Sequence, residues 1–249
     1  MKKFLTDVAD LFIFTANFFV KFFRPPYEIS EISRHILVLG LNSLFLISTS
    51  ALIIGMVMSI QLTPTLEQFG AETLIPNMVA ISIIREIGPV LTALVCAGKL
   101  GSAIGAEIGS MKVSEQIDAM AVTGVDHYSF LVVTRVVATT VAVPILTIYS
   151  VAISLLGSFI AINLTSSISL NLFFSRAFEY MHLYDVIPSI FKSLLFGFTI
   201  GIVGCFYGYN TTKGTAGVGK AAHTSVVSAS LLIFFIDMLA AEISHLIIP

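Results

Sequence analysis

The stretch that decides the fold runs from Arg85 to Gly124 and reads REIGPVLTALVCAGKLGSAIGAEIGSMKVSEQIDAMAVTG. It begins with two adjacent charges inside an apolar run and ends in a short charged segment. Between them, small residues recur at every fourth position, which places them along one face of a helix. Small residues at this spacing let two helix backbones approach closely in a bilayer, where packing drives association. The pattern leaves open whether the contact is static or moves. The positions expected to pack in this way are Ala97, Gly101, Gly105 and Gly109.

The composition of the whole chain is that of an integral membrane protein. Hydrophobic residues make up 56% of its 249 positions and charged residues 11%, whereas a soluble domain carries about 25% charged residues. The formal net charge of −2 provides no basic surface for phosphates, so we expect no nucleic-acid partner. Cys96 and Cys205 lie in apolar runs, and the five histidines are scattered. We therefore expect no metal site, no cofactor and no catalytic residue.

Hydropathy divides residues 1–249, which we treat as one domain, into five apolar runs. A helix that crosses a bilayer needs about 20 apolar residues, and each run provides them. A shorter helix is expected in the charged segment between the second and third runs. The predicted fold class is therefore an all-α integral membrane protein with an N-terminal interfacial amphipathic helix, five transmembrane helices and a short cytoplasmic helix. The predicted spans are residues 35–62, 78–111, 128–162, 188–209 and 224–247.

Residues 1–24 form the predicted interfacial helix. Its polar residues recur at alternating four- and three-residue spacing on an otherwise apolar helix, a pattern typical of a helix at the headgroup boundary. A signal peptide is the alternative, because Lys2 and Lys3 precede an apolar stretch. Asp7 and Asp10 interrupt that stretch, however, and no small-residue cleavage site follows before Arg24.

Basic residues predict the orientation in the membrane, because short cytoplasmic loops carry an excess of Lys and Arg. The flank of the first predicted span contains Lys2, Lys3, Lys21, Arg24 and Arg34. Alternation of the spans places five more basic residues on that side, and the opposite loops contain only Arg176. We therefore expect a cytoplasmic N-terminus and an external C-terminus. The five further residues are Lys99, Lys112, Arg135, Lys213 and Lys220.

The predicted short helix covers residues 114–122. Ser114 is suited to cap its N-terminus, and Glu115 and Asp118 would lie in the first turn, where the helix dipole favours acidic groups. Ile117 and Met120, with Ala121, would give it a small apolar face. Such a helix on the cytoplasmic side is suited to contact a soluble partner, although the pattern also fits a surface turn that has no partner.

Among the charged residues of the apolar spans, the candidates for a functional site are Arg85, Glu86, Lys192 and Asp237. With the predicted orientation, all four occupy the outer half of the membrane, roughly 6–15 Å deep at about 1.5 Å per residue. Charges at such depth are costly unless they face a water-filled cavity or one another. The pattern predicts either an outward-opening polar pocket for a zwitterionic or anionic headgroup, or a set of ion pairs that stabilise the bundle.

One apparent nucleotide-binding motif is rejected. Residues 214–221, GTAGVGKA, nearly match the phosphate-binding loop GxxxxGK[ST]. Ala221 lacks the hydroxyl that would bind magnesium, and an apolar helix rather than a strand precedes the motif. We expect these glycines to shape a turn between the fourth and fifth spans, and any ATP must be hydrolysed by another chain.

Two stretches closely resemble the signature of MlaE-type permeases, the membrane subunits of lipid-transporting ABC systems. One is the run from Arg85 to Met120, and the other is FKSLLFGFTIGIVGCFYGY at 191–209 followed by GTAGVGKAAHTSVVSASLLIFFID at 214–237. The resemblance covers nearly the whole chain, although the N-terminal third matches only in character. It implies a homodimeric permease of the bacterial inner membrane that is not itself an enzyme.

The resemblance also implies partners and site residues. The family binds a dimeric ABC ATPase on the cytoplasmic side and an assembly of MCE-domain protein on the periplasmic side, and it moves phospholipid between them. Arg85, Glu86, Lys192 and Asp237 fall at positions that line or support the family's lipid cavity. The segment similar to its coupling helix begins with Ser114, Glu115, Gln116, Ile117, Asp118, Ala119 and Met120 and ends at Val122.

The residues themselves leave two other functions open. One is an ion-coupled secondary transporter that uses Glu86 and Asp237 as proton or sodium sites, although five spans show no inverted repeat of the kind such carriers contain. The other is a membrane-embedded enzyme acting on lipids, although no single span contains a His/Asp or metal-binding constellation.

Overall fold

The computed structural model describes residues 2–23, 28–165, 168–212 and 214–247, and every regular element in these ranges is a helix. Within them, five helices are long and apolar enough to cross a membrane. An additional helix precedes them at the N-terminus. The predicted all-α membrane class, with five spans and an N-terminal helix, is therefore confirmed. The candidate spans are Ile29–Gln68, Glu72–Val113, Ser129–Leu164, Leu183–Tyr209 and Thr215–Ser244.

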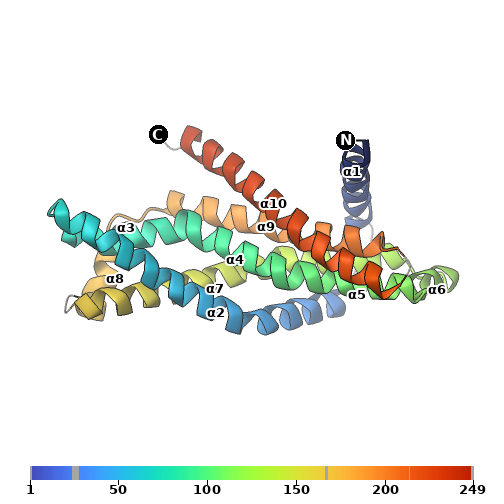
Figure 1. Cartoon of the computed structure of the whole chain (residues 1–249), viewed down its shortest axis with the longest axis horizontal. Coiled ribbons are helices and arrows are strands. Elements are labelled where there is room, and N and C mark those ends of the chain that lie inside the picture. Colours follow the sequence, from blue (N-terminus) through green and yellow to red (C-terminus); the bar gives the residue numbers. More distant parts are fainter. Residues whose placement is uncertain (1, 24–27, 166–167, 213, 248–249) are drawn as a thin grey trace.

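The second span is not one regular helix. It consists of a 3-10 turn, three α-helices and two π-helical turns, η2 (Ile83–Ile87) and η3 (Ala97–Gly101), and a third π turn, η4 (Ser129–Val133), begins the third span. Most elements run along the long axis of the molecule, with α6 and α8 at opposite ends (Figure 1). The α-helices are α1 Lys2–Phe22, α2 Ile29–Gln68, α3 Ile75–Ser82, α4 Gly88–Cys96, α5 Ser102–Val113, α6 Gln116–Val122, α7 Thr134–Thr165, α8 Leu170–Phe178, α9 Leu183–Tyr209 and α10 Thr215–Ile247.

Helix α1 lies across the bundle axis rather than along it (Figure 1). Its buried residues Phe14 and Phe18 pack against aromatic rings of the bundle. The Tyr128 hydroxyl donates to the Phe14 carbonyl at 2.6 Å, and Lys21 forms an ion pair with Asp126. The opposite face of α1 exposes apolar side chains, which fits a helix lying in the membrane interface. Those exposed residues are Phe12, Ile13, Phe19 and Val20.

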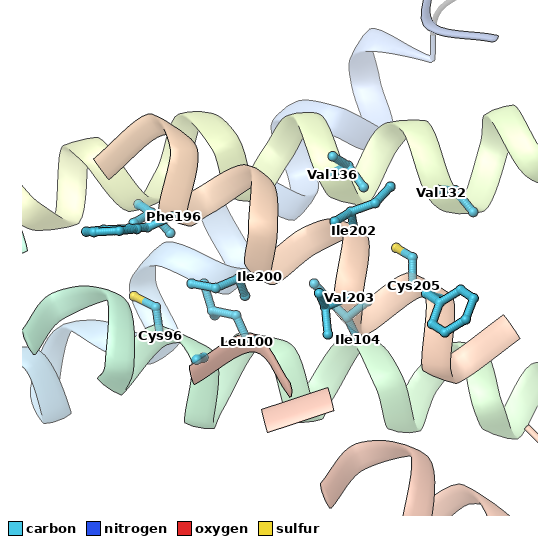
Figure 2. Packing of buried hydrophobic residues seen from close by; sticks show 14 of the residues in the cluster. Cys96, Leu100, Ile104, Val132, Val136, Phe196, Ile200, Ile202, Val203 and Cys205 are labelled. Atoms are coloured by element: carbon cyan, nitrogen blue, oxygen red, sulfur yellow. The ribbon is translucent and has the colours of Figure 1, made fainter. Parts of the chain in front are cut away.

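The core forms where α9 packs between the second span and α7. Figure 2 shows Leu100 and Ile104 meeting Ile200 and Val203 on one side of α9, while Ile202 faces Val136 on the other. Glycines on two sides of α9 allow these close contacts, because the neighbouring helix occupies the space that a side chain of α9 would otherwise fill. A Cβ atom at Gly197 would lie 2.5 Å from the Thr139 carbonyl oxygen of α7, and one at Gly208 would lie 3.0 Å from the Gly105 carbonyl oxygen of α5.

The predicted glycine-rich turn between the fourth and fifth spans is wrong in extent. Helix α10 begins at Thr215, so most of the stretch is helical, and the span starts nine residues before the predicted position 224. Of its glycines only Gly214 has a positive φ, 93°, a conformation that glycine adopts without steric cost. Gly217 lies in the first turn of α10, where a Cβ atom would clash with the Thr212 carbonyl. The glycine there permits close packing rather than a turn.

Candidate functional site

Arg85 and Glu86 lie in the π turn η2, which interrupts the second span. The N–H of Gly88 donates to the carbonyl of Ile83, five residues back. Pro89 has no N–H and cannot bond to the carbonyl of Arg85, which removes one α-helical hydrogen bond at this point. A Cβ atom at Gly88 would lie only 2.6 Å from the Ile83 carbonyl oxygen, so the Gly-Pro pair accounts for the wide turn. Such π turns are frequent at functional sites.

The four charged residues predicted from the sequence lie in one cluster, which joins η2, α9 and α10. Lys192 Nζ of α9 is 2.7 Å from Glu86 Oε2 and 3.1 Å from Asp237 Oδ1 of α10. Arg85 Nε is 2.6 Å from Asp185 Oδ1. Asp185 and Lys192 are two helical turns apart on α9, so both face η2. Arg85 and Glu86 are adjacent in η2 and point in different directions, so each forms an ion pair with a different residue of α9.

Asp185 was not among the predicted site residues, because it precedes the predicted fourth span, which begins at residue 188. Helix α9 instead begins at Leu183, and Asp185 occupies its first turn. Its Oδ2 accepts the backbone N–H of His182 at 2.9 Å while its Oδ1 contacts Arg85. An acidic residue in a first helical turn is a recognised start signal, so the helix start was detectable. The contact with Arg85 depends on the fold and was not.

Asp185→Asn is expected to lower transport several-fold while the protein still folds. Asparagine can still accept the His182 N–H but no longer neutralises Arg85, whose side chain is half-exposed, so the loss of stability should be about 1 kcal/mol or less. Transport in reconstituted vesicles and thermal unfolding of the purified protein test this. Asp126→Asn, which removes the ion pair with Lys21 at α1, is the matched control. Unchanged transport in the Asp185 variant would show that the pair has no part in function.

Two cavities meet at the charged cluster. The first, here called the polar chamber, has a volume of about 210 Å³ and is lined by Arg85, Glu86, Tyr184, Asp185, Pro188, Lys192, Ala241 and Ser244. The second, here called the apolar groove, lies between α9 and α10 and has a volume of about 520 Å³. Its lining is Ile187, Pro188, Phe191, Lys192, Leu195, Ile236, Leu239, Ala240, Ile243 and Ser244.

Pro188, Lys192 and Ser244 line both cavities, so the polar chamber and the apolar groove adjoin. Asp237 lines neither of them and contacts Lys192 instead. The combination offers charged groups at one end and a hydrocarbon-like surface at the other. A ligand with a charged head and an apolar chain matches both parts.

The predicted ladder of small residues lies in the contact between the second span and the last two helices. A Cβ atom at Gly105 would lie 2.6 Å from Ser225 Oγ of α10, and one at Gly109 would lie 2.8 Å from Thr211 Oγ1. Gly101 has more room, with Ile200 Cγ2 at 3.8 Å, and Ala97 is fully buried. The ladder therefore brings α5 and α10 together within one chain.

The start of α6 differs from the prediction. Ser114 does not cap this helix; it ends α5, and its hydroxyl donates back to the Ser110 carbonyl at 2.8 Å. Glu115 precedes the helix in a left-handed conformation with φ 60°, and α6 begins at Gln116. Because the Ser114 hydroxyl is already bonded within α5, it is not available to α6.

Helix α6 lies at the end of the molecule opposite α8 (Figure 1). Ile117 is buried and attaches α6 to the core, and Met120 is partly buried. Lys112 lies in the preceding helix, α5, and its Nζ forms an ion pair with Asp118 Oδ1 at 2.9 Å. The remaining side chains face outward from this helix. Those exposed residues are Gln116, Ala119, Ala121 and Val122, and Glu115 just before the helix is exposed as well.

A second set of charges is also partnered inside the bundle. Arg135, only 4% exposed, forms an ion pair with Glu107 at 2.7 Å and donates to the Leu131 carbonyl at 3.0 Å. Lys99 donates to the carbonyl of Asn42. The distribution of basic residues in the sequence assigns Lys99 and Arg135 to the cytoplasmic side of the membrane. Because both cations lie in candidate spans, their pairing removes much of the cost of burying them.

Comparisons with known proteins identify the family of the chain. The family described as Permease MlaE matches residues 32–243. A probable ABC transporter permease protein of Rickettsia typhi is 34% identical over 97% of this chain and 93% of its own length. A probable ABC transporter permease protein of Synechocystis is 40% identical over 78% of this chain and 74% of its own length. The intermembrane phospholipid transport system permease protein MlaE of Haemophilus influenzae is 34% identical over 83% of this chain and 79% of its own length. The chain is therefore a member of the MlaE family of ABC transporter permeases.

Proposed function

We propose that this chain moves phospholipid between the bacterial inner membrane and an assembly of MCE-domain protein, driven by a separate ABC ATPase. The observation that supports this most is that the polar chamber and the apolar groove adjoin at Lys192. A phospholipid headgroup fits the charged part, and an acyl chain fits the surface between α9 and α10. The relative from Haemophilus influenzae is named as a phospholipid transport permease, which supports the same substrate class.

We further propose that α6 and the residues before it, Ser114–Val122, contact the ATPase. With the N-terminus in the cytoplasm, α6 faces the cytoplasm and the polar chamber lies toward the periplasm, because they occupy opposite ends of the bundle. A pair of ATPase subunits needs two such contacts, so the working unit is a homodimer. Helix α10 leaves a row of apolar residues exposed in the single chain, available to lipid or to the second copy. This row contains Val227, Leu231, Phe234, Phe235 and Met238.

Reversing the charge of both Glu115 and Asp118 to lysine is expected to uncouple ATP hydrolysis from lipid movement. Both side chains are exposed and lie around the start of α6, and Asp118 would also lose its ion pair with Lys112. Stability should change by about 1 kcal/mol or less because these groups are solvated. The measurement compares lipid-stimulated ATPase activity and bound phospholipid in the assembled transporter. Stimulation equal to that of the unmodified protein would remove α6 from the coupling mechanism.

Purification of the chain from its native membrane in mild detergent tests the proposed assembly. We expect an ABC ATPase, an MCE-domain protein and phospholipid to be recovered with it. An ion-coupled carrier would instead transport solute in vesicles that contain this chain alone. The pairing of Glu86 and Asp237 with Lys192 disfavours that alternative, because both carboxylates already have a cationic partner. Ion-dependent transport without an ATPase would refute the proposed function.

A further inference from the structure

The charges around the polar chamber differ in how far a ligand can reach them. The side chains of Arg85 and Glu86 are 44% and 48% exposed, whereas those of their partners Asp185 and Lys192 are 6% and 2% exposed. Arg85 and Glu86 both line the polar chamber. A ligand in the polar chamber therefore contacts these two residues, and the buried charges act by positioning them.

Arg85 and Glu86 each keep free hydrogen-bonding capacity. Arg85 contacts Asp185 through Nε, and its two terminal nitrogens have no partner among the described residues. These nitrogens form a planar set of donors that suits a phosphate group. Glu86 contacts Lys192 through Oε2, which leaves Oε1 as an acceptor. The chamber thus presents one free cationic donor and one free anionic acceptor, each supported from behind by a buried partner.

The charge balance of the cluster favours a ligand that brings a positive group. The cluster contains three carboxylates and two cations, so its formal net charge is −1. The carboxylates are those of Glu86, Asp185 and Asp237, and the cations are Arg85 and Lys192. Lys192 is already shared between two carboxylates, so it has little attraction left for an added anion. A lipid with an uncompensated negative phosphate would therefore meet net repulsion that is poorly screened inside the membrane.

We propose that the polar chamber selects phospholipids whose headgroup carries a primary ammonium, such as phosphatidylethanolamine, over anionic phospholipids such as phosphatidylglycerol. This inference rests on the proposed phospholipid transport. Arg85 binds the phosphate through its terminal nitrogens, and Glu86 accepts a hydrogen bond from the ammonium. Glu86 is then the residue that determines specificity, because phosphate is common to both lipids and only the ammonium distinguishes them.

Lipid competition in nanodiscs tests the proposal. The purified chain is placed in equimolar phosphatidylethanolamine and phosphatidylglycerol with identical acyl chains, and the retained lipid is identified by native mass spectrometry. We expect about a two- to five-fold preference for phosphatidylethanolamine, the range that a half-exposed ion pair supplies. Glu86→Gln should reduce the ratio to about one, since the amide has the same shape but no charge. Glu67→Gln, which removes an exposed acidic group near the end of α2, is the matched control and should retain the preference.

Each result bears on a different claim. Equal retention of the two lipids by the unmodified protein, which requires no variant to fold, would overturn the selectivity and leave phospholipid transport standing. An unchanged preference in Glu86→Gln would overturn the role of Glu86. Phosphatidylcholine is a third probe because its quaternary ammonium has no N–H, and retention equal to that of phosphatidylethanolamine would overturn the hydrogen bond. Retention of no phospholipid at all would overturn the proposed function itself.

Discussion

Lys192→Met should abolish phospholipid transport and sharply reduce the amount of folded protein. Lys192 is 2% exposed and is the shared partner of Glu86 and Asp237. Its removal leaves two carboxylates near each other without a cation. Breaking a buried ion pair in this way costs about 3–5 kcal/mol, and the lower end applies here because water still reaches Glu86. Lipid transport in reconstituted vesicles and the yield of monodisperse protein in detergent measure the two effects.

A variant that removes Lys192 together with both of its carboxylate partners separates stability from function. Glu86→Gln, Lys192→Met and Asp237→Asn together remove all three charges while keeping the side-chain volumes similar. Replacing a complete buried ion cluster is often close to neutral for stability, so we expect the folded yield to recover and transport to remain absent. Recovery of transport along with the fold would show that the cluster only stabilises the bundle.

Gly55→Ala should also prevent normal assembly, although it adds a single methyl group. Gly55 lies where α2 crosses α7, and a Cβ atom there would overlap the backbone carbonyl of Ser154. Gly157 makes the reciprocal contact with the carbonyl of Leu52, and Ser59 donates to Ser158 at 2.6 Å nearby. Because backbone cannot move aside as a flexible side chain can, we expect a loss at or above about 3 kcal/mol, the upper end for overpacking.

Gly40→Ala is the matched control in the same helix. A Cβ atom at Gly40 has nothing within 4 Å, so alanine there should be neutral or stabilise α2 by about 0.5–1 kcal/mol. Thermal unfolding in detergent and the yield from the membrane compare the two variants. Equal yields for both variants would mean that α2 and α7 do not approach as closely as the structure shows.

The sequence was sufficient for the fold class because the bilayer imposes simple requirements. An apolar run of sufficient length must be helical, so the spans could be located without knowing how they pack. The same apolar background made Arg85, Glu86, Lys192 and Asp237 conspicuous, and the structure gathers all four. The fourfold spacing of the small residues identified a packing face, although its partners on α9 and α10 could not be derived.

The features that were missed depend on hydrogen bonds and close contacts, some of them local and some between distant segments. Asp185 lies outside the predicted spans, between residues 162 and 188. The start of α9 at Leu183 places it beside Arg85. Ser114 fits a helix cap by residue type, but its hydroxyl bonds to Ser110 within the preceding helix. The stretch 214–220 has the composition of a turn, yet most of it is helical because Gly217 packs against the preceding loop.

Site-specific photocrosslinking tests the central claim, that the polar chamber and the apolar groove together hold a phospholipid. Tyr184 lines the chamber and Phe191 lines the groove, and both are aromatic and exposed, so benzoylphenylalanine is a modest replacement at either position. Phe45, an exposed residue of α2, is the control for ordinary membrane contact. We predict that both sites capture phospholipid, in amounts that exceed those at position 45 and that fall in the Lys192→Met, Glu86→Gln, Asp237→Asn triple variant. Capture no greater than at position 45, or capture of a small polar solute instead, would contradict the account.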